Sequence, residues 1–258
     1  MANIILSSRS GNDWTRNELH ALNITVVPLD PIIFFGMATL PNPTVDPILF
    51  QDLARPAGAI SKENRLFFRY LRDVSGLSTK SAVDDFAAFL LKLLDYDEPG
   101  RVVRQLHRPE ISFLMSGRKV DATPDVVVMD EEDYILLLQG YKSDSGGHEA
   151  EPRLIAAAVA AHYENNRRRR ALGLPVVPSK VFAGIVVTGT ALTFYKIPIS
   201  EDLLDAISRA QYPTAPTVVH KLVPPVPNLH KYLSEGMVSL DNRRIVFQCL
   251  EAFRQFVI

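Results

Sequence analysis

The segment 124–143, PDVVVMDEEDYILLLQGYKS, places an acid and a base at corresponding ends of two apolar stretches. Asp125 opens the first stretch and Lys142 closes the second, and an acidic turn joins the two. Carboxylates of this kind hold Mg²⁺ in metal-assisted hydrolysis, where a nearby lysine stabilises or orients the attacking water. The pattern therefore predicts a hairpin that brings Asp125 and Lys142 into one cleft.

The residue two positions before Lys142 bears on how complete such a site is. Residues two apart in a strand point to the same face, so an acid at position 140 would lie beside Lys142. That position holds Gly140, and the pleat sends Gln139 to the opposite face. Asp144 would share the face of Lys142 if the strand continues that far. One carboxylate at Asp125 is poor provision for Mg²⁺, which is usually held by one or two carboxylates with water and substrate oxygens.

The composition of the 258-residue chain is that of a soluble globular protein with a sizeable core: 47% of the residues are hydrophobic and 22% are charged. The formal net charge of -1 gives no global attraction to nucleic acid or to an anionic membrane, so any such attraction must be local. One cysteine, Cys249, excludes an intramolecular disulfide and a cysteine-based zinc site. With neither a cationic leader nor an apolar run long enough to span a bilayer, we expect an intracellular protein, cytoplasmic or nuclear, and no membrane partner.

The spacing of apolar residues predicts the elements around the hairpin. Helical periods cover 61–75 and 81–94, and in the second helix Ser81 and Asp84 form a variant of the capping box. Short apolar runs bounded by turn residues predict strands at 111–115, 125–129, 134–142, 181–188 and 192–197, with an alanine-rich helix after Pro152 between the third and the fourth. Because strands 125–129 and 134–142 are almost wholly apolar, we expect an α/β fold whose central mixed sheet has helices on both faces.

Two flanking regions differ from this central part, 61–200. Residues 1–60 contain six prolines between short apolar pieces, which favours an extended N-terminal arm packed on the core. Residues 201–258 begin with a short helix over 201–210, pass through a proline-rich linker and end in an amphipathic helix over 241–257. The five prolines of the linker argue against regular structure there.

This order of elements resembles the PD-(D/E)XK nuclease superfamily, which has the restriction-endonuclease-like fold. Pro124 and Asp125 stand where that family has its PD, and Lys142 stands where it has its catalytic lysine. More narrowly, the chain is similar to a group of largely uncharacterised mushroom-type fungal proteins assigned to the superfamily. The segments that carry this similarity are SSRSGNDW, FFRYL, AVDDFAAFLL, EPRLIAAAVAA and GTALTFYKIP, together with the hairpin.

The resemblance implies a metal-dependent nuclease site built on Asp125 and Lys142. The fungal group has a glutamate at the position of Gly140, so we expect a degraded metal site and a protein that is weak or inactive as a nuclease and acts by binding, a pseudoenzyme. Losing one metal carboxylate costs on the order of thousands-fold in rate. The alternative is an active Mg²⁺-dependent nuclease that takes its second acid from the preceding helix, where the superfamily often has one. The candidates there are Asp84 and Asp85.

A run of four arginines, Arg167, Arg168, Arg169 and Arg170, ends the alanine-rich helix. Two interpretations stay open: positive charge that complements the helix dipole at a solvated end, or a contact surface for nucleic-acid phosphates. His162, on the apolar face of the same helix, fits a buried histidine with a hydrogen-bond partner better than a catalytic base. Nucleic acid, a protein partner and a second copy of the chain are the partners compatible with these features.

Overall fold

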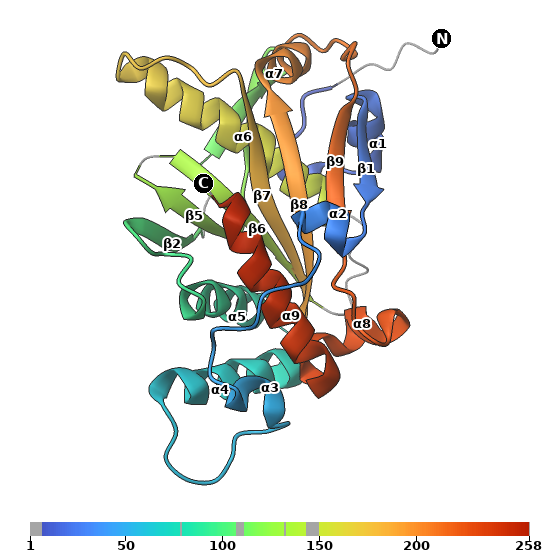
Figure 1. Ribbon diagram of the computed structural model, residues 1–258. Helices are drawn as coiled ribbons and strands as arrows, with labels where there is room; N and C mark the ends of the chain where they lie inside the picture. The colour runs from blue at the N-terminus through green and yellow to red at the C-terminus, as the bar shows by residue number, and fades with distance from the viewer. Residues whose placement is uncertain (1–6, 78, 107–110, 132, 143–149, 258) are drawn as a thin grey trace.

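The computed structural model describes residues 7–77, 79–106, 111–131, 133–142 and 150–257. Its centre is a mixed sheet of seven strands in the order β1-β9-β8-β7-β6-β5-β2 (Figure 1). The strands of this sheet are β1 (Ile24–Pro28), β2 (Arg101–Gln105), β5 (Val126–Asp130), β6 (Asp133–Tyr141), β7 (Ser179–Thr188), β8 (Ala191–Ser200) and β9 (Thr217–Leu222). The predicted α/β class with a mixed central sheet is confirmed.

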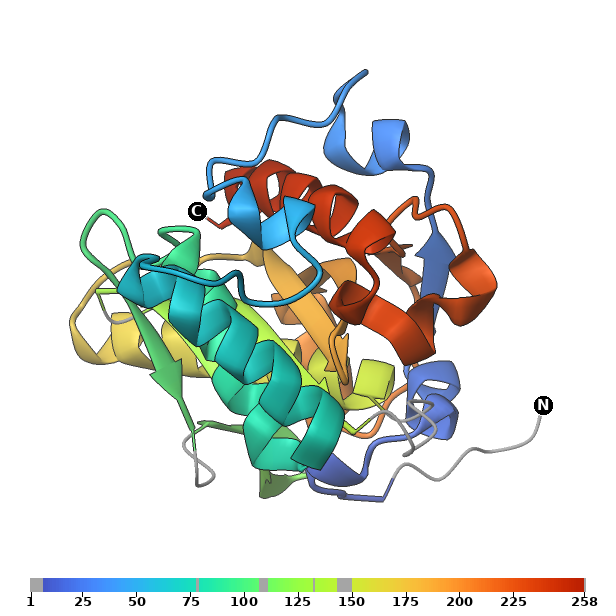
Figure 2. The same cartoon turned by 90° about the horizontal axis from the view of Figure 1, so that it is seen from below.

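Helices cover both faces of the sheet, as the apolar central strands predict. The α-helices are α1 (Arg16–Ala21), α2 (Pro31–Phe35), α3 (Ile48–Gln51), α4 (Lys62–Leu77), α5 (Lys80–Leu93), α6 (Ala150–Ala171), α7 (Glu201–Ser208), α8 (Leu229–Glu235) and α9 (Leu240–Phe253). Helices α4, α5 and α9 pack with one buried apolar cluster, and α6 and α7 pack with the other. In the view from below, α4 and α5 lie side by side under the sheet (Figure 2).

Alternation along the central strands divides the core into these two clusters. Val126 and Val128 of β5 belong to the cluster under α5, and Val127 belongs to the cluster under α6. Strand β6 is antiparallel to β5 and parallel to β7, and α6 is the long crossover connection that a parallel pair requires. None of the described helices is both long and apolar enough to cross a bilayer.

The first of the five predicted strands lies outside the central sheet. The segment Ile111–Met115 is a strand, β3, but it pairs with β4 (Arg118–Ala122) in a separate two-stranded sheet that packs against α6 and α7. Strand β2 takes its place beside β5. The apolar run 111–115 was visible in the sequence, whereas the edge strand β2 reads RVVRQ and shows neither an apolar run nor a regular alternation.

Both flanking regions contribute to the sheet, which the proline content did not indicate. The region 1–60 contains β1 and the short helices α1, α2 and α3, so it is more regular than the expected extended arm. The proline-rich linker contains β9, which pairs with β8 and, in parallel, with β1. The expectation of no regular structure there is wrong because the linker prolines lie before and after Thr217–Leu222, and none lies within it.

Candidate active site

Asp125 lies directly before β5, where the backbone fixes its place at the end of two paired strands. Its N–H donates to the carbonyl of Leu138 at 2.9 Å, and its carbonyl accepts from the N–H of Leu106 at 2.9 Å. The side chain is buried, and its Oδ2 accepts two hydrogen bonds, from Gln139 Nε2 at 2.6 Å and from the Gly140 N–H at 2.7 Å. The carboxylate is therefore held in one orientation, with Oδ1 left for a cation.

The cation that contacts Oδ1 of Asp125 is the ammonium of Lys80, in the first turn of α5. The same nitrogen lies 3.1 Å from Oδ2 of Asp84. Lys80 and Asp84 are four residues apart, so they lie on one side of the helix. A single ammonium thus bridges two carboxylates, one from the helix and one from the start of β5.

The capping role predicted for Asp84 is wrong, because the helix begins earlier than the sequence suggested. The N-cap is Thr79, whose hydroxyl accepts from the N–H of Ala82 at 3.3 Å. Asp84 therefore lies in the second turn, where its carboxylate is not needed to cap the helix. It points toward the sheet instead.

Gly140 leaves the space that the Asp84 carboxyl group fills. A Cβ built on Gly140 would overlap Oδ1 of Asp84 and would lie 3.4 Å from Cγ of Asp84 and from the side chain of Val83. The position where the sequence lacks a carboxylate is thus adjacent to a carboxylate that arrives from α5.

Burial and charge together make Asp84 easier to protonate. The pKa of Asp84 rises from 3.8 to about 6, first because the side chain is desolvated and second because the Asp125 carboxylate repels its negative charge. The ammonium of Lys80 opposes both effects without cancelling them. The cluster therefore favours additional positive charge near neutral pH.

Two further predicted site residues, Asp85 and Lys142, have exposed side chains. Asp85 is exposed and accepts a hydrogen bond from Gln105 Nε2 at 2.9 Å, so it turns toward β2. Lys142 directly follows the last residue of β6, and its side chain is exposed. Asp144 lies outside the described residues. The structure brings Asp84 and Asp125 together around Lys80. The spacing of four residues between Lys80 and Asp84 in KSAVD is the sequence signal that could have indicated the ion pair between them.

The four consecutive arginines near the end of α6 each contact a different part of the protein. Arg168 stacks on the ring of Tyr134, with its guanidinium carbon 5.0 Å from the ring centroid. The other three bind Glu164 (Arg167, 2.6 Å), the Pro175 carbonyl (Arg169, 2.9 Å) and Glu201 (Arg170, 3.2 Å). Tyr134 is at the beginning of β6 and Gly140 near its end, so at about 3.3 Å per residue the run lies about 20 Å along the strand from the Asp125 cluster.

An N-terminal turn supports the backbone that leads into Asp125. Asn12, in the 3₁₀ turn η1 (Gly11–Asp13), donates to Thr123 Oγ1 at 3.2 Å and accepts from the Thr123 N–H at 3.0 Å. A Cβ on Gly11 would lie 2.7 Å from that of Ala122, so only glycine allows the turn to approach this closely. The segment SRSGND therefore fixes the chain just before the cluster.

Two carboxylates of the cluster could provide ligands for a divalent cation. Within the described ranges, no three Asp, Glu, His or Cys side chains gather into a metal-binding group. Two carboxylates do converge on one cationic nitrogen, and Mg²⁺ is commonly held by one or two carboxylates that leave places for water and phosphate oxygens. Asp125 Oδ1 and the Asp84 carboxylate fit that donor set.

Comparison with known proteins adds no family assignment to this geometry. No protein-family model matches the chain, and no curated protein matches it either.

Proposed function

We propose that the protein is a divalent-metal-dependent phosphodiesterase of the PD-(D/E)XK nuclease type, in which Asp84 replaces the strand carboxylate missing at position 140. The observation that carries this proposal is the position of the Asp84 carboxyl group, which fills the space beside Gly140 and shares the Lys80 ammonium with Asp125. This arrangement favours the alternative of an active enzyme over the degraded site that the sequence alone suggests.

Each residue of the cluster has a role that follows from its contacts. Asp125 and Asp84 would hold Mg²⁺ or Mn²⁺, which when bound polarises a phosphate and acidifies a water molecule. Gln139 and the Gly140 N–H fix Oδ2 of Asp125, so that Oδ1 faces Asp84 and Lys80. Lys80 partly neutralises the two carboxylates and would offer a positive charge to the phosphate of a substrate.

A second candidate function is binding without cleavage. Lys80 already pairs with both carboxylates, and Asp85 is turned away toward Gln105, so a metal ion must compete with an ammonium for two ligands. A site that keeps the ammonium in place would bind a partner through the nuclease-like surface and would leave phosphodiesters intact. This is the function expected from Gly140 alone.

A cleavage assay distinguishes the nuclease from the binding protein. Its substrates are plasmid DNA, single-stranded DNA and RNA, and Mg²⁺ or Mn²⁺ is titrated into each reaction. The first proposal expects metal-dependent cleavage that Asp84→Asn and Asp125→Asn each reduce by about a thousandfold. Asp85→Asn is the matched control, since Asp85 neighbours Asp84 and lies outside the cluster. The absence of metal-dependent cleavage by the unchanged protein would refute the enzyme and favour the binding function, and cleavage unaffected by Asp84→Asn would refute the assignment of the site.

A further inference from the structure

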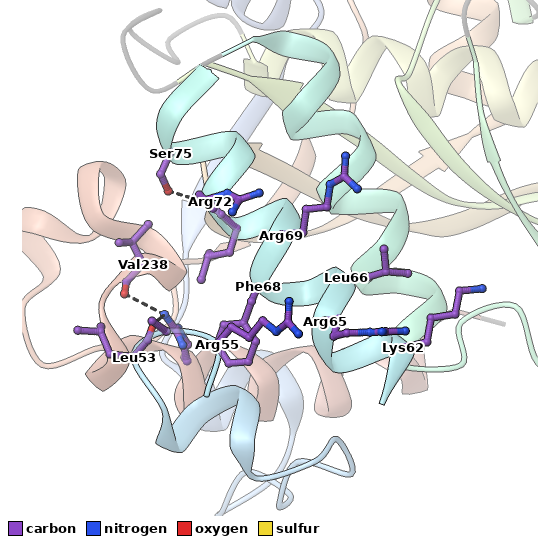
Figure 3. A pocket seen from close by; sticks show the side chains of 13 residues that line it. Leu53, Arg55, Lys62, Arg65, Leu66, Phe68, Arg69, Arg72, Ser75 and Val238 are labelled. Carbon is purple, nitrogen blue, oxygen red and sulfur yellow. Dashed lines mark hydrogen bonds between the residues drawn. The ribbon is translucent and has the colours of Figure 1, made fainter. Parts of the chain in front are cut away.

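A groove beside α4 is lined by basic residues, apolar residues and Ser75, and none of the lining residues that the structure describes is an acid. It has a volume of about 970 Å³ and is bounded by α4, by the chain that follows α3 and by the 3₁₀ turn η2 (Gly236–Val238) (Figure 3). Its basic lining residues are Arg55, Lys62, Arg65, Arg69, Arg72 and Arg243. In a chain of net charge -1, this is a strong local concentration of positive charge.

The basic side chains follow one stripe of the helix. Lys62, Arg65, Arg69 and Arg72 are spaced by three, four and three residues, so they lie in a row that covers about 15 Å at 1.5 Å per residue. Figure 3 shows these side chains along α4, with Leu53, Arg55 and Val238 beside the helix on other segments. Like charges at these spacings disfavour a helix by about 0.2 to 0.5 kcal/mol per pair, and an acidic partner would relieve that repulsion.

The basic side chains that line the groove are accessible to an incoming partner. All five basic side chains other than Arg243 are exposed. Arg69 and Arg72 each reach Asp73 at 3.6 Å, which makes weak, solvent-screened pairs. Within the described part of the chain, Arg55, Lys62 and Arg65 belong to no ion pair. A carboxylate entering the groove therefore displaces little to reach these cations.

The apolar wall of the groove is held rigidly in place. Leu53 and Val238 are 66% and 40% exposed, although both are apolar. The buried guanidinium of Arg243 donates to the carbonyls of both residues, at 2.9 Å and 3.3 Å. Phe68 and Leu71 of α4 are buried and close the floor. The groove is thus formed before any partner arrives, which lowers the entropic cost of binding.

We infer that this groove docks an acidic amphipathic helix of a partner protein. Such a helix offers carboxylates one turn apart to the α4 stripe and apolar side chains to Leu53, Val238 and the floor, as in other helix-in-groove complexes. Single-stranded nucleic acid fits less well, because the aromatic ring in the lining, Phe68, is buried and offers no face for a base to stack on. This docking site is independent of the Asp84–Asp125 cluster and of the activity proposed for it.

Fluorescence anisotropy of the full-length protein with a labelled helical peptide of about four turns tests the inference. The peptide has Glu and Leu on a common face, and its control has the same composition with the two residue types on opposite faces. We expect the first peptide to bind at least about tenfold more tightly, with an affinity that falls as salt rises. We also expect Arg65→Glu combined with Arg69→Glu to weaken binding by more than about tenfold.

Two further measurements keep the test decisive. Arg16→Glu combined with Arg209→Glu reverses two exposed arginines away from the groove and is expected to leave peptide binding unchanged. Because all four arginines are exposed, both double variants should keep the thermal midpoint of the unchanged protein, which is measured in parallel. Equal affinity for the two peptides, equal effects of the two double variants, or tighter binding of an oligothymidine at the Arg65 and Arg69 surface would each overturn the inference.

Discussion

Lys80 and Asp125 form an ion pair that joins the first turn of α5 to the start of β5. The side chain of Lys80 is 48% exposed, whereas the side chain of Asp125 is only 11% exposed. Asp84 contacts the same ammonium, so one positive charge serves two negative ones. The balance of charge in this cluster therefore determines both its stability and its affinity for added cations.

Removing the ammonium should destabilise the protein more at alkaline than at acidic pH. In Lys80→Met the carboxylates of Asp84 and Asp125 face each other without a cation, and we expect a loss of about 1 to 2 kcal/mol in the free energy of unfolding at pH 8. At pH 5 the loss should be smaller, because Asp84 takes up a proton. Urea denaturation at the two pH values measures the difference. Lys231→Met, in an exposed pair with Glu235 at 4.0 Å, is the control and should change stability by less than about 0.5 kcal/mol.

The raised pKa of Asp84 should make its ionisation cost stability. Since the folded-state pKa is about 6 and the ordinary value is 3.8, this group stabilises the fold fully below pH 3.8, and that contribution is lost as pH rises through about 6. The whole difference is at most about 3 kcal/mol. Asp84→Asn should therefore be more stable than the unchanged protein at pH 8, by about 1 to 3 kcal/mol, and nearly equal to it at pH 4.

Chemical denaturation of both proteins between pH 4 and pH 8 tests that prediction. The difference between their free energies of unfolding at each pH separates the effect of Asp84 from that of the other acids. A variant less stable than the unchanged protein at pH 8 would contradict it. Greater stability of the Asn variant, together with loss of metal-dependent cleavage, would be a trade of stability for function at this position.

A side chain at position 140 should compete with Asp84. Gly140→Ala places a Cβ where Oδ1 of Asp84 lies, and we expect a loss of about 1 to 3 kcal/mol in the free energy of unfolding. The combination with Asp84→Ala removes the overlapping atoms, so the two changes together should cost less than their sum. Gly76→Ala in α4 is the matched control: its added Cβ meets nothing within 4 Å, and it should stabilise the helix by about 0.5 to 1 kcal/mol. Additive effects in the cycle would contradict the contact.

The helices and strands that have a clear apolar run or a helical period in the sequence could be predicted. The apolar runs of β5, β6, β7 and β8 and the period of α4 gave their positions within a few residues. Strands β1, β2 and β9 could not be recognised, because all three are partly exposed and their pairing joins segments far apart in the chain. For β9 the flanking prolines also hid a proline-free segment that pairs with β8.

Asp125 and Asp84 of the cluster were among the predicted site residues, whereas Lys80, which contacts both, was not. Asp125 stood out because a polar residue opens a wholly apolar strand. Lys80 was missed because the start of α5 was placed at Ser81, which left Lys80 outside the helix and gave Asp84 a capping role. The position of the N-cap decides which residues lie in the first turn and can cap the helix, and helix ends are the least certain part of any sequence pattern.

Cys249 should report the global unfolding of the protein. Its side chain is fully buried beside the α9 core, and desolvation raises the pKa of the thiol to about 12. Since the thiolate is the reactive form, we expect a thiol reagent at pH 8 to react with the native protein at least about a thousandfold more slowly than with the protein in concentrated urea. Comparable rates in the two conditions would show that α9 opens far more easily than its packing implies.

Arg243 should be one of the most destabilising positions to change, although it belongs to no ion pair among the described residues. Its guanidinium donates to five carbonyls, those of Leu49, Asp52, Leu53, Met237 and Val238. It therefore ties the chain after α3 to η2 and α9. Arg243→Met leaves these carbonyls without a donor, and we expect a loss of about 3 to 5 kcal/mol in the free energy of unfolding.

Two comparisons distinguish this hydrogen-bonding role from a simple effect of charge. Arg243→Lys keeps the positive charge but has three donors in place of five, so it should recover only part of the loss. Arg244→Met changes an exposed neighbour on the same helix and should alter stability by less than about 0.5 kcal/mol. Because the carbonyls of Asp52 and Leu53 lose their anchor, limited proteolysis of Arg243→Met should cut first in the chain that follows α3. Full recovery by the lysine variant would assign the effect to charge, and uniform proteolysis would show that the anchor does not hold this segment.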